Sequence, residues 1–309
     1  MRFATDLGFR LAVALCWLSS VLTVSLPGRA MTATRSQRQL TWQRDWPRFS
    51  PAEFALTGSL LLGTGVLLVT DTGDEPNWRG PVLFDESVRD VLRGGTPATR
   101  EAAQTASDAF YYAGLAYPYL VDVVAVAWLT RESPDVAGQM ALIDTEAFAV
   151  TGFLSFLSNA TLKRERPSRR ECSAGKPDPI FPACDDSGPS EAFYSGHTGI
   201  AFTGAGLICM HHAHLALYGS GPGGTITCAA SLAGATLGGA LRVVADQHYA
   251  SDVIAGGAIG LAFGLVVPWL HYGPAASGAD ATATAVVASW SARPTFSSTS
   301  AALVLDGRF

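Results

Sequence analysis

Six apolar segments constrain the fold of this chain more than any other feature of its sequence. They lie at residues 54–69, 109–129, 140–157, 199–217, 225–241 and 253–270. A helix needs roughly 20 mostly apolar residues to cross a bilayer, and these segments approach that length. The composition agrees, because 48% of the residues are hydrophobic and only 15% are charged, which is apolar for a soluble domain. We therefore expect an all-α fold, a transmembrane bundle of about six helices over 54–272.

The N-terminal region is read in two parts. Residues 1–30 combine Arg2 and Arg10, an apolar run after them and small residues near position 30, which is typical of a secretory signal peptide or an uncleaved signal anchor. Residues 31–53 form an expected polar linker with four arginines, which favour the cytoplasmic side. A cleaved signal would instead place this linker outside. At the other end, 273–309 is an Ala/Ser/Thr-rich, low-complexity tail with a short strand expected near 302–305.

Charge and cysteine placement narrow the classes of function. The net charge of −5, with basic residues gathered only around 163–176, predicts no nucleic-acid partner. Cys172 and Cys184 lie in a polar loop, where such a pair predicts a disulfide in a secreted or periplasm-facing protein. Cys209 and Cys228 lie in apolar segments and are expected to be inert core thiols.

Some polar residues interrupt the apolar segments themselves. Asp122, Asp144 and Glu146 are expected to face the bundle interior, because charges are costly at membrane depth. They would either tune a site or pair within the bundle. His211 and His214 belong to a His-His-Ala-His run without acids or cysteines nearby in sequence, so this run does not favour a metal site.

Three short motifs carry the candidate chemistry. They are Arg166-Pro167, Ser195-Gly196-His197 at the start of an apolar run, and Arg242 followed by His248 and Asp252. Helical spacing of four places His248 and Asp252 on one face, where the carboxylate can accept a proton from the ring. The imidazole is then a nucleophile or a base. Arginine forks suit phosphate oxygens.

In this order and at these separations, the motifs resemble the signature of the type 2 phosphatidic acid phosphatase (PAP2) superfamily, over residues 54–272. That superfamily also contains vanadium haloperoxidases and class A acid phosphatases. The resemblance implies that His248 attacks phosphorus, Asp252 orients it and His197 protonates the leaving oxygen. It also implies a phosphohistidine and no metal or other cofactor, with vanadate binding only as a phosphate mimic. The phosphate-binding residues would be Arg166, Ser195, Gly196, Arg242 and Lys163.

The sequence departs from the family pattern at three positions. The first motif usually begins with a lysine seven residues before Arg166, and here that residue is Asn159. Lys163, one turn later, could replace it, or the site could function with one cation fewer. Tyr194 replaces the usual proline, and Leu241 replaces the usual serine before Arg242.

These features together predict an integral membrane enzyme, expected in a bacterial inner membrane with its site facing the periplasm. Its partners would be membrane lipids and a substrate that is a lipid phosphate or diphosphate. One alternative is a vanadium-dependent haloperoxidase, which could use the same pocket. Another is a membrane scaffold or transporter with a degenerate site. Neither the substrate head group nor the oligomeric state follows from the sequence.

Overall fold

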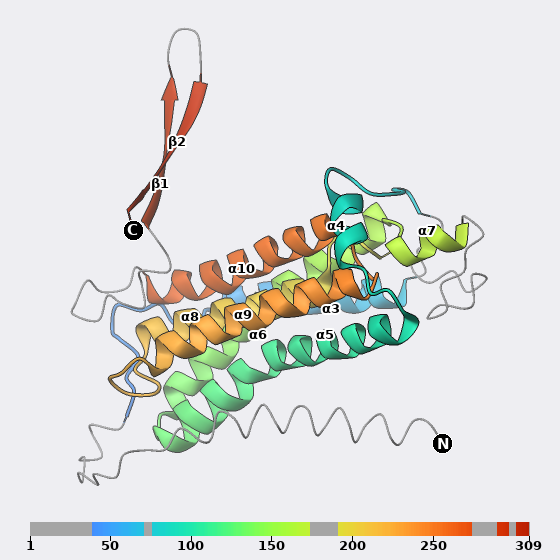
Figure 1. The fold of residues 1–309 in the computed structure, drawn as a ribbon. Coiled ribbons are helices and arrows are strands. Elements are labelled where there is room, and N and C mark those ends of the chain that lie inside the picture. The colour runs from blue at the N-terminus through green and yellow to red at the C-terminus, as the bar shows by residue number, and fades with distance from the viewer. Residues whose placement is uncertain (1–38, 71–75, 174–190, 274–288, 297–300, 309) are drawn as a thin grey trace, which may run out of the picture.

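Long helices that run side by side make up the protein in a computed structural model (Figure 1). The structure describes residues 39–70, 76–173, 191–273, 289–296 and 301–308. The signal-like segment 1–30 and Cys184 lie outside the described part, so the expected Cys172–Cys184 disulfide lies outside it as well. The helices are α3 (Pro51–Val69), α4 (Asp85–Leu92), α5 (Pro97–Tyr117), η1 (Pro118–Thr130), α6 (Pro134–Leu162), α7 (Pro167–Ser173), α8 (Gly196–His214), α9 (Gly223–Val244) and α10 (Ala250–Tyr272).

The expected all-α bundle is confirmed, and five of the six predicted apolar segments lie within one long helical run each, whereas 199–217 extends three residues beyond α8. α5 and η1 form one continuous run in which the helix widens to π-helical geometry from Pro118. Five runs, α3, α5 with η1, α6, α9 and α10, are long and apolar enough to cross a membrane. The sixth long helix, α8, lacks the required hydropathy, although it is 19 residues long.

α8 owes its lower hydropathy to its place at the centre of the bundle. It packs against α5, α6, α9 and α10, and the core around Met140, Ile143 and Leu207 lies where it meets α6. Glycines make this packing close. A methyl group on Gly260 of α10 would collide with the Gly199 carbonyl, and one on Gly204 would collide with the Gly114 carbonyl. Small residues at such positions let membrane helices approach closely.

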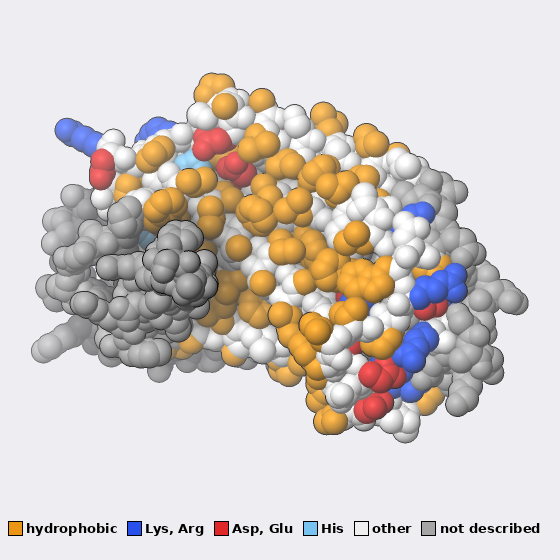
Figure 2. Space-filling view, turned by 90° about the horizontal axis from the view of Figure 1, so that it is seen from above, with side chains coloured by type: hydrophobic (Ala, Val, Ile, Leu, Met, Phe, Trp, Pro, Cys, Tyr) orange, Lys and Arg blue, Asp and Glu red, His pale blue; other side chains and the backbone are white. Residues whose placement is uncertain are grey.

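The outer surface of the bundle carries a band of apolar side chains (Figure 2). Leu62 and Val69 of α3 are 75% and 85% exposed, and Trp269 of α10 is half exposed. Charged side chains gather beyond this band at an end of the molecule (Figure 2). A continuous apolar surface of this kind marks an interaction with another apolar phase, so the described helices form a membrane-type bundle.

Residues 39–50 differ from the expected polar linker, because they pack against the bundle. Trp46 is buried in the main core, and the backbone N–H of Leu40 donates to Ser133 Oγ at 2.8 Å. Arg48 pairs with Asp135 at the start of α6 at 2.6 Å. The aromatic side chains provide enough apolar surface to hold this segment against the bundle despite its polar composition.

Two further expectations concern the cysteines and the tail. Cys209 and Cys228 are not inert thiols: they form a disulfide that joins α8 to α9. The prediction was wrong because segments that are distant in sequence become adjacent helices. The short strand expected in the tail is present, since β2 (Ala301–Arg308) pairs antiparallel with β1 (Ser289–Phe296).

Candidate active site

The three motifs meet at one end of the bundle, beside α4. Arg166 follows α6, Ser195 is the N-cap of α8, and Arg242 lies in the last turn of α9. His248 lies in the short connection between α9 and α10. Because consecutive long helices alternate in direction, these chain breaks come to the same end. The expectation that one site gathers all three motifs is consistent with the contacts below.

Arg164 is the structural centre of this end, although sequence reasoning gave it no role beyond its charge. Its side chain is fully buried and donates to Asp85 at 2.7 Å and to Asp252. Its guanidinium carbon lies 4.2 Å from the ring centroid of Trp78 and 4.3 Å from that of Tyr249. Cation–π contacts strengthen when they are desolvated. Arg164 therefore ties the segment after α6 to α4 and α10.

Asp85 is held as a carboxylate by this arrangement. Burial alone would raise the pKa of Asp85, but the N–H groups of Val82 and Ser251 and the Arg164 guanidinium lower it below its usual range. A buried carboxylate that accepts several such donors is stable in its charged form. Arg164 is thus one cation between two carboxylates, those of Asp85 and Asp252.

His248 presents one ring nitrogen to the site. Its Nδ1 lies 2.8 Å from the Ala192 carbonyl oxygen and 3.9 Å from the Asp252 carboxylate. The N–H on Nδ1 therefore donates to Ala192, and Nε2 carries the lone pair. Sequence reasoning assigned the orienting role to Asp252. Its carboxylate instead accepts from the Tyr249 N–H at 2.8 Å and from Arg164, which fixes the connection that carries His248.

The environment of His248 keeps the ring neutral. Burial, followed by the positive charges of Arg242 and Arg166, lowers the pKa of His248 well below its usual range, against the opposing effect of the Ala192 carbonyl. A neutral imidazole with a free lone pair is the nucleophilic form. The structure thus places a buried, neutral imidazole under the electrostatic influence of two arginines.

The two arginines keep hydrogen-bond donors available. Arg166 donates from Nη1 to Gln247 Oε1 at 2.8 Å, and Arg242 donates to Asp108 Oδ1 at 3.3 Å. The Nε atoms of both are buried and have no acceptor among the described residues. Buried donors of this kind are costly unless an acceptor satisfies them, and an anion with several oxygens would do so.

His197 is held by a residue that sequence reasoning missed. Its Nε2 lies 3.1 Å from Asp108 Oδ1, the oxygen that also pairs with Arg242. Its ring packs at 4.7 Å from that of Tyr111. Asp108 and Tyr111 lie on α5, and the only sequence signal was that Asp108 is the last acid before an apolar segment.

Ser195 and Gly196 build the start of α8. The Ser195 N–H donates to the Asp252 carbonyl at 3.1 Å, and its hydroxyl lies 2.9 Å from that of Thr198. A methyl group on Gly196 would meet Ser155 Oγ of α6 at 2.6 Å, so glycine lets α8 begin against α6. The first N–H groups of a helix attract anions, and here they start beside His197.

Comparison with known proteins agrees with this geometry. A family model described as "PAP2 superfamily" matches residues 142–274, a segment that contains all three motifs. These residues form a PAP2 superfamily domain. No curated protein and no solved structure matched the chain. The PAP2 domain runs from α6 to α10, so Asp85 and Asp108 reach its site from helices outside the matched segment.

Asn159 replaces the lysine of the PAP2 pattern, and one of its side-chain atoms lacks a hydrogen-bond partner among the described residues. Asn159 lies in the last turn of α6, and its Oδ1 is buried without a partner among the described residues. Lys163 follows as the left-handed C-cap, with φ of 44°, and its N–H donates to the Asn159 carbonyl at 3.3 Å. Lys163 lies three residues before Arg166. That its charge replaces the lysine missing at position 159 stays a prediction.

At the opposite end of the PAP2 domain, the histidine run is paired with the intramembrane acids. His211 contacts Asp144 at 2.8 Å and His212 contacts Asp122 at 3.2 Å. No acid lies near these histidines in sequence, but α6 and η1 bring two from elsewhere in the chain. The acids face the bundle interior as expected and pair within it.

Replacement of Arg164 tests its structural role. Arg164→Leu should lower the free energy of unfolding by about 3 to 5 kcal/mol, because it leaves two buried carboxylates without their cation. Arg170→Leu is the matched control, since the Arg170–Glu86 pair is 2.8 Å apart but largely exposed and should contribute less than about 1 kcal/mol. Denaturation in detergent measures both, and similar losses for the two variants would contradict the role of Arg164.

Proposed function

We propose that the protein is a membrane phosphatase that hydrolyses a lipid phosphate or diphosphate through a phosphohistidine. The observation that carries the proposal is that His248, whose Nδ1 is held by the Ala192 carbonyl, shares one end of the bundle with Arg166 and Arg242, whose buried Nε donors have no acceptor among the described residues. The transferred phosphoryl group needs positive charge and N–H donors around its oxygens, and a nucleophile in line. The PAP2 match supports a phosphatase-type function.

In the first step, the His248 Nε2 lone pair would attack phosphorus while the bond from phosphorus to the lipid oxygen breaks. Nδ1 keeps its proton, and the Ala192 carbonyl 2.8 Å away stabilises the charge that develops on the ring. His197 would give its proton to the departing oxygen. Arg166 and Arg242 would bind the phosphoryl oxygens, together with the start of α8.

In the second step, water would attack the phosphohistidine, and the phosphorus–nitrogen bond would break. His197, now neutral, would accept the proton of that water and thereby return to its starting state. Asp108 would act as a positioning residue, because its contact with His197 at 3.1 Å keeps one ring nitrogen directed along a fixed line. Phosphate is then released and His248 is again neutral.

The location of the site supports a lipid substrate. The site lies at the end of five helices that are apolar enough to cross a membrane, and the bundle carries an apolar outer band (Figure 2). A phosphate at this depth would belong to a molecule whose chains lie in the bilayer. We propose that one site accepts both monoester and diphosphate head groups, because both present the same terminal phosphoryl oxygens.

Phosphate release from a panel of lipid phosphates tests the function. His248→Ala should reduce kcat/KM by at least ~10³-fold, as expected for the loss of a covalent nucleophile. His214→Ala, in the last turn of α8, is a matched control at the other end of the bundle and should retain activity. Vanadate should inhibit competitively.

Two results would contradict this proposal. Equal activity of His248→Ala and the parent chain would show that His248 is not the nucleophile. Bromide oxidation on addition of vanadate, without phosphate release, would instead identify a haloperoxidase.

The pH profile tests the electrostatic environment of His248. Since its pKa lies well below its usual range, the nucleophile stays neutral as pH falls, and the acid limb of kcat/KM should lie below about pH 6.5. Arg166→Gln should move this limb to higher pH, because one positive neighbour is lost and protonation becomes easier. Arg170→Gln should leave the limb in place. An unmoved limb in Arg166→Gln would contradict the coupling.

We also propose a bacterial inner-membrane location with the site facing the periplasm. Arg44 and Arg48 lie beside Trp46, which packs on His214 at the far end of α8. Positive charge favours the cytoplasmic side, so the pocket would face outward. The Cys209–Cys228 disulfide lies nearer the Arg48 end and would favour the reverse orientation, because disulfides form in oxidising compartments.

Thiol labelling decides between the two orientations. A membrane-impermeant maleimide added to intact spheroplasts should label Arg170→Cys, near the pocket, above the background of the parent chain. It should not label Arg44→Cys until the membrane is opened. The opposite pattern would place the site in the cytoplasm.

A further inference from the structure

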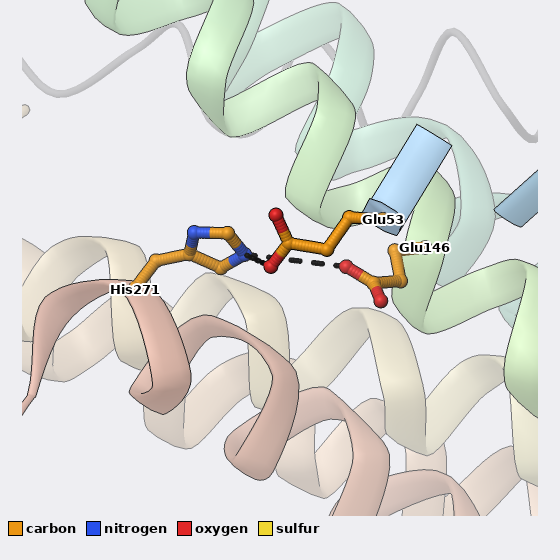
Figure 3. A group of neighbouring side chains, drawn as sticks. All are labelled: Glu53, Glu146 and His271. Carbon is orange, nitrogen blue, oxygen red and sulfur yellow. Dashed lines mark ion pairs between the residues drawn. The ribbon is translucent and has the colours of Figure 1, made fainter. Parts of the chain in front are cut away.

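Three side chains from three helices converge at the end of the bundle opposite His248. Glu53 lies in the first turn of α3, Glu146 lies within α6, and His271 lies in the last turn of α10. One ligand atom from each lies within 4.8 Å of the others, and Figure 3 shows the three side chains pointing toward one another. α10 begins beside His248 and ends here, so the cluster is remote from the pocket.

The imidazole of His271 has a defined direction. Its Nδ1 lies 3.2 Å from the Pro47 carbonyl oxygen, so the N–H on Nδ1 donates to that carbonyl. The ring also stacks on Phe49, with centroids 5.9 Å apart and an angle of 10° between the planes. Nε2 therefore faces the carboxylates. A metal-bound histidine usually donates its other N–H to a backbone carbonyl in this way.

Both carboxylates have an oxygen available for the cluster. Glu53 accepts the Ser50 N–H on Oε2 at 2.5 Å, which leaves Oε1 directed at His271 Nε2, 3.5 Å away. Glu146 is only 7% exposed, and the partner that the structure records for it is His271, at 4.0 Å. A buried carboxylate without a close hydrogen-bond donor is costly, and Glu146 is directed into this cluster.

His271 Nε2 and the carboxylate oxygens of Glu53 and Glu146 are all hydrogen-bond acceptors, so their grouping requires a positive charge. A proton on His271 Nε2 would supply one, but charge-assisted N–H···O bonds are about 2.7 to 2.9 Å long, and the observed separations are longer. Two ligands of a tetrahedral zinc ion, each about 2.0 to 2.1 Å from the metal, lie about 3.3 Å apart. The separations of 3.5 and 4.0 Å approach that value and need only small rotations of the carboxylates.

We propose that Glu53 Oε1, Glu146 Oε2 and His271 Nε2 bind a divalent transition-metal ion of the zinc type. One imidazole and two carboxylates suit such ions, and water would fill the remaining position on the partly exposed side of Glu53. The ion would fasten α3 to α6 and α10. This would add a polar link for α3, a helix in which Thr57 alone is buried. The site takes no part in phosphoryl transfer.

Zinc titration of the full chain in detergent tests the proposal. After EDTA treatment and dialysis, calorimetry should show one Zn²⁺ bound per chain at the cluster at micromolar concentration, and the ion should raise the midpoint of thermal unfolding. Glu146→Gln keeps the shape of the side chain and should weaken binding at least ~100-fold, more than the loss of an outer partner does. His271→Ala should abolish binding at this site.

His212→Ala and His214→Ala are the matched controls, because both histidines lie at the same end of the bundle but outside the cluster. Zinc affinity should be unchanged in each. Co²⁺ provides a second readout, since ligand-field absorption bands should appear in the parent chain and be lost in Glu146→Gln even if His271→Ala does not fold. Absence of Zn²⁺ binding, or binding and Co²⁺ bands that Glu146→Gln leaves unchanged, would overturn the metal site in favour of a protonated His271.

Discussion

The end of the bundle that carries His248 depends on one buried cation. Arg164 lies between Asp85 and Asp252, with the rings of Trp78 and Tyr249 against its faces. Buried ion pairs contribute less to stability than their geometry suggests, but loss of one partner is strongly destabilising. Because Asp252 also caps α10 and the Arg164 backbone accepts the Ala192 N–H at 3.0 Å, this cation sets the positions of His248 and of the segment before α8.

The polar chemistry is divided between the PAP2 segment and the helices before it. The matched residues 142–274 supply His248, His197 and both arginines. Asp85 and Asp108 come from α4 and α5, which precede that segment. One supports Arg164 and the other joins His197 to Arg242. Family resemblance thus covers the groups that would contact phosphate, whereas their orientation also depends on residues that the family pattern does not include.

The sequence predicted the helices and the convergence of the motifs well, because both follow from local signals. Apolar segments specify where helices occur, and alternation of helix direction brings residues such as Arg166 and His248 to one end. The partners of those residues could not be predicted in this way. Asp108, the Cys209–Cys228 bridge and the His211–Asp144 pair join positions far apart in sequence, and each depends on which helices become neighbours and how they are rotated.

The central position of α8 also affects how this protein can be made. α8 has the length of a spanning helix without the hydropathy of one, and its glycines leave no space between it and α10. A translocon selects segments by their own transfer free energy, so α8 would gain little by entering the lipid alone. Its integration must then be cooperative, with the neighbouring hydrophobic helices retained nearby until α8 has a surface on which to assemble.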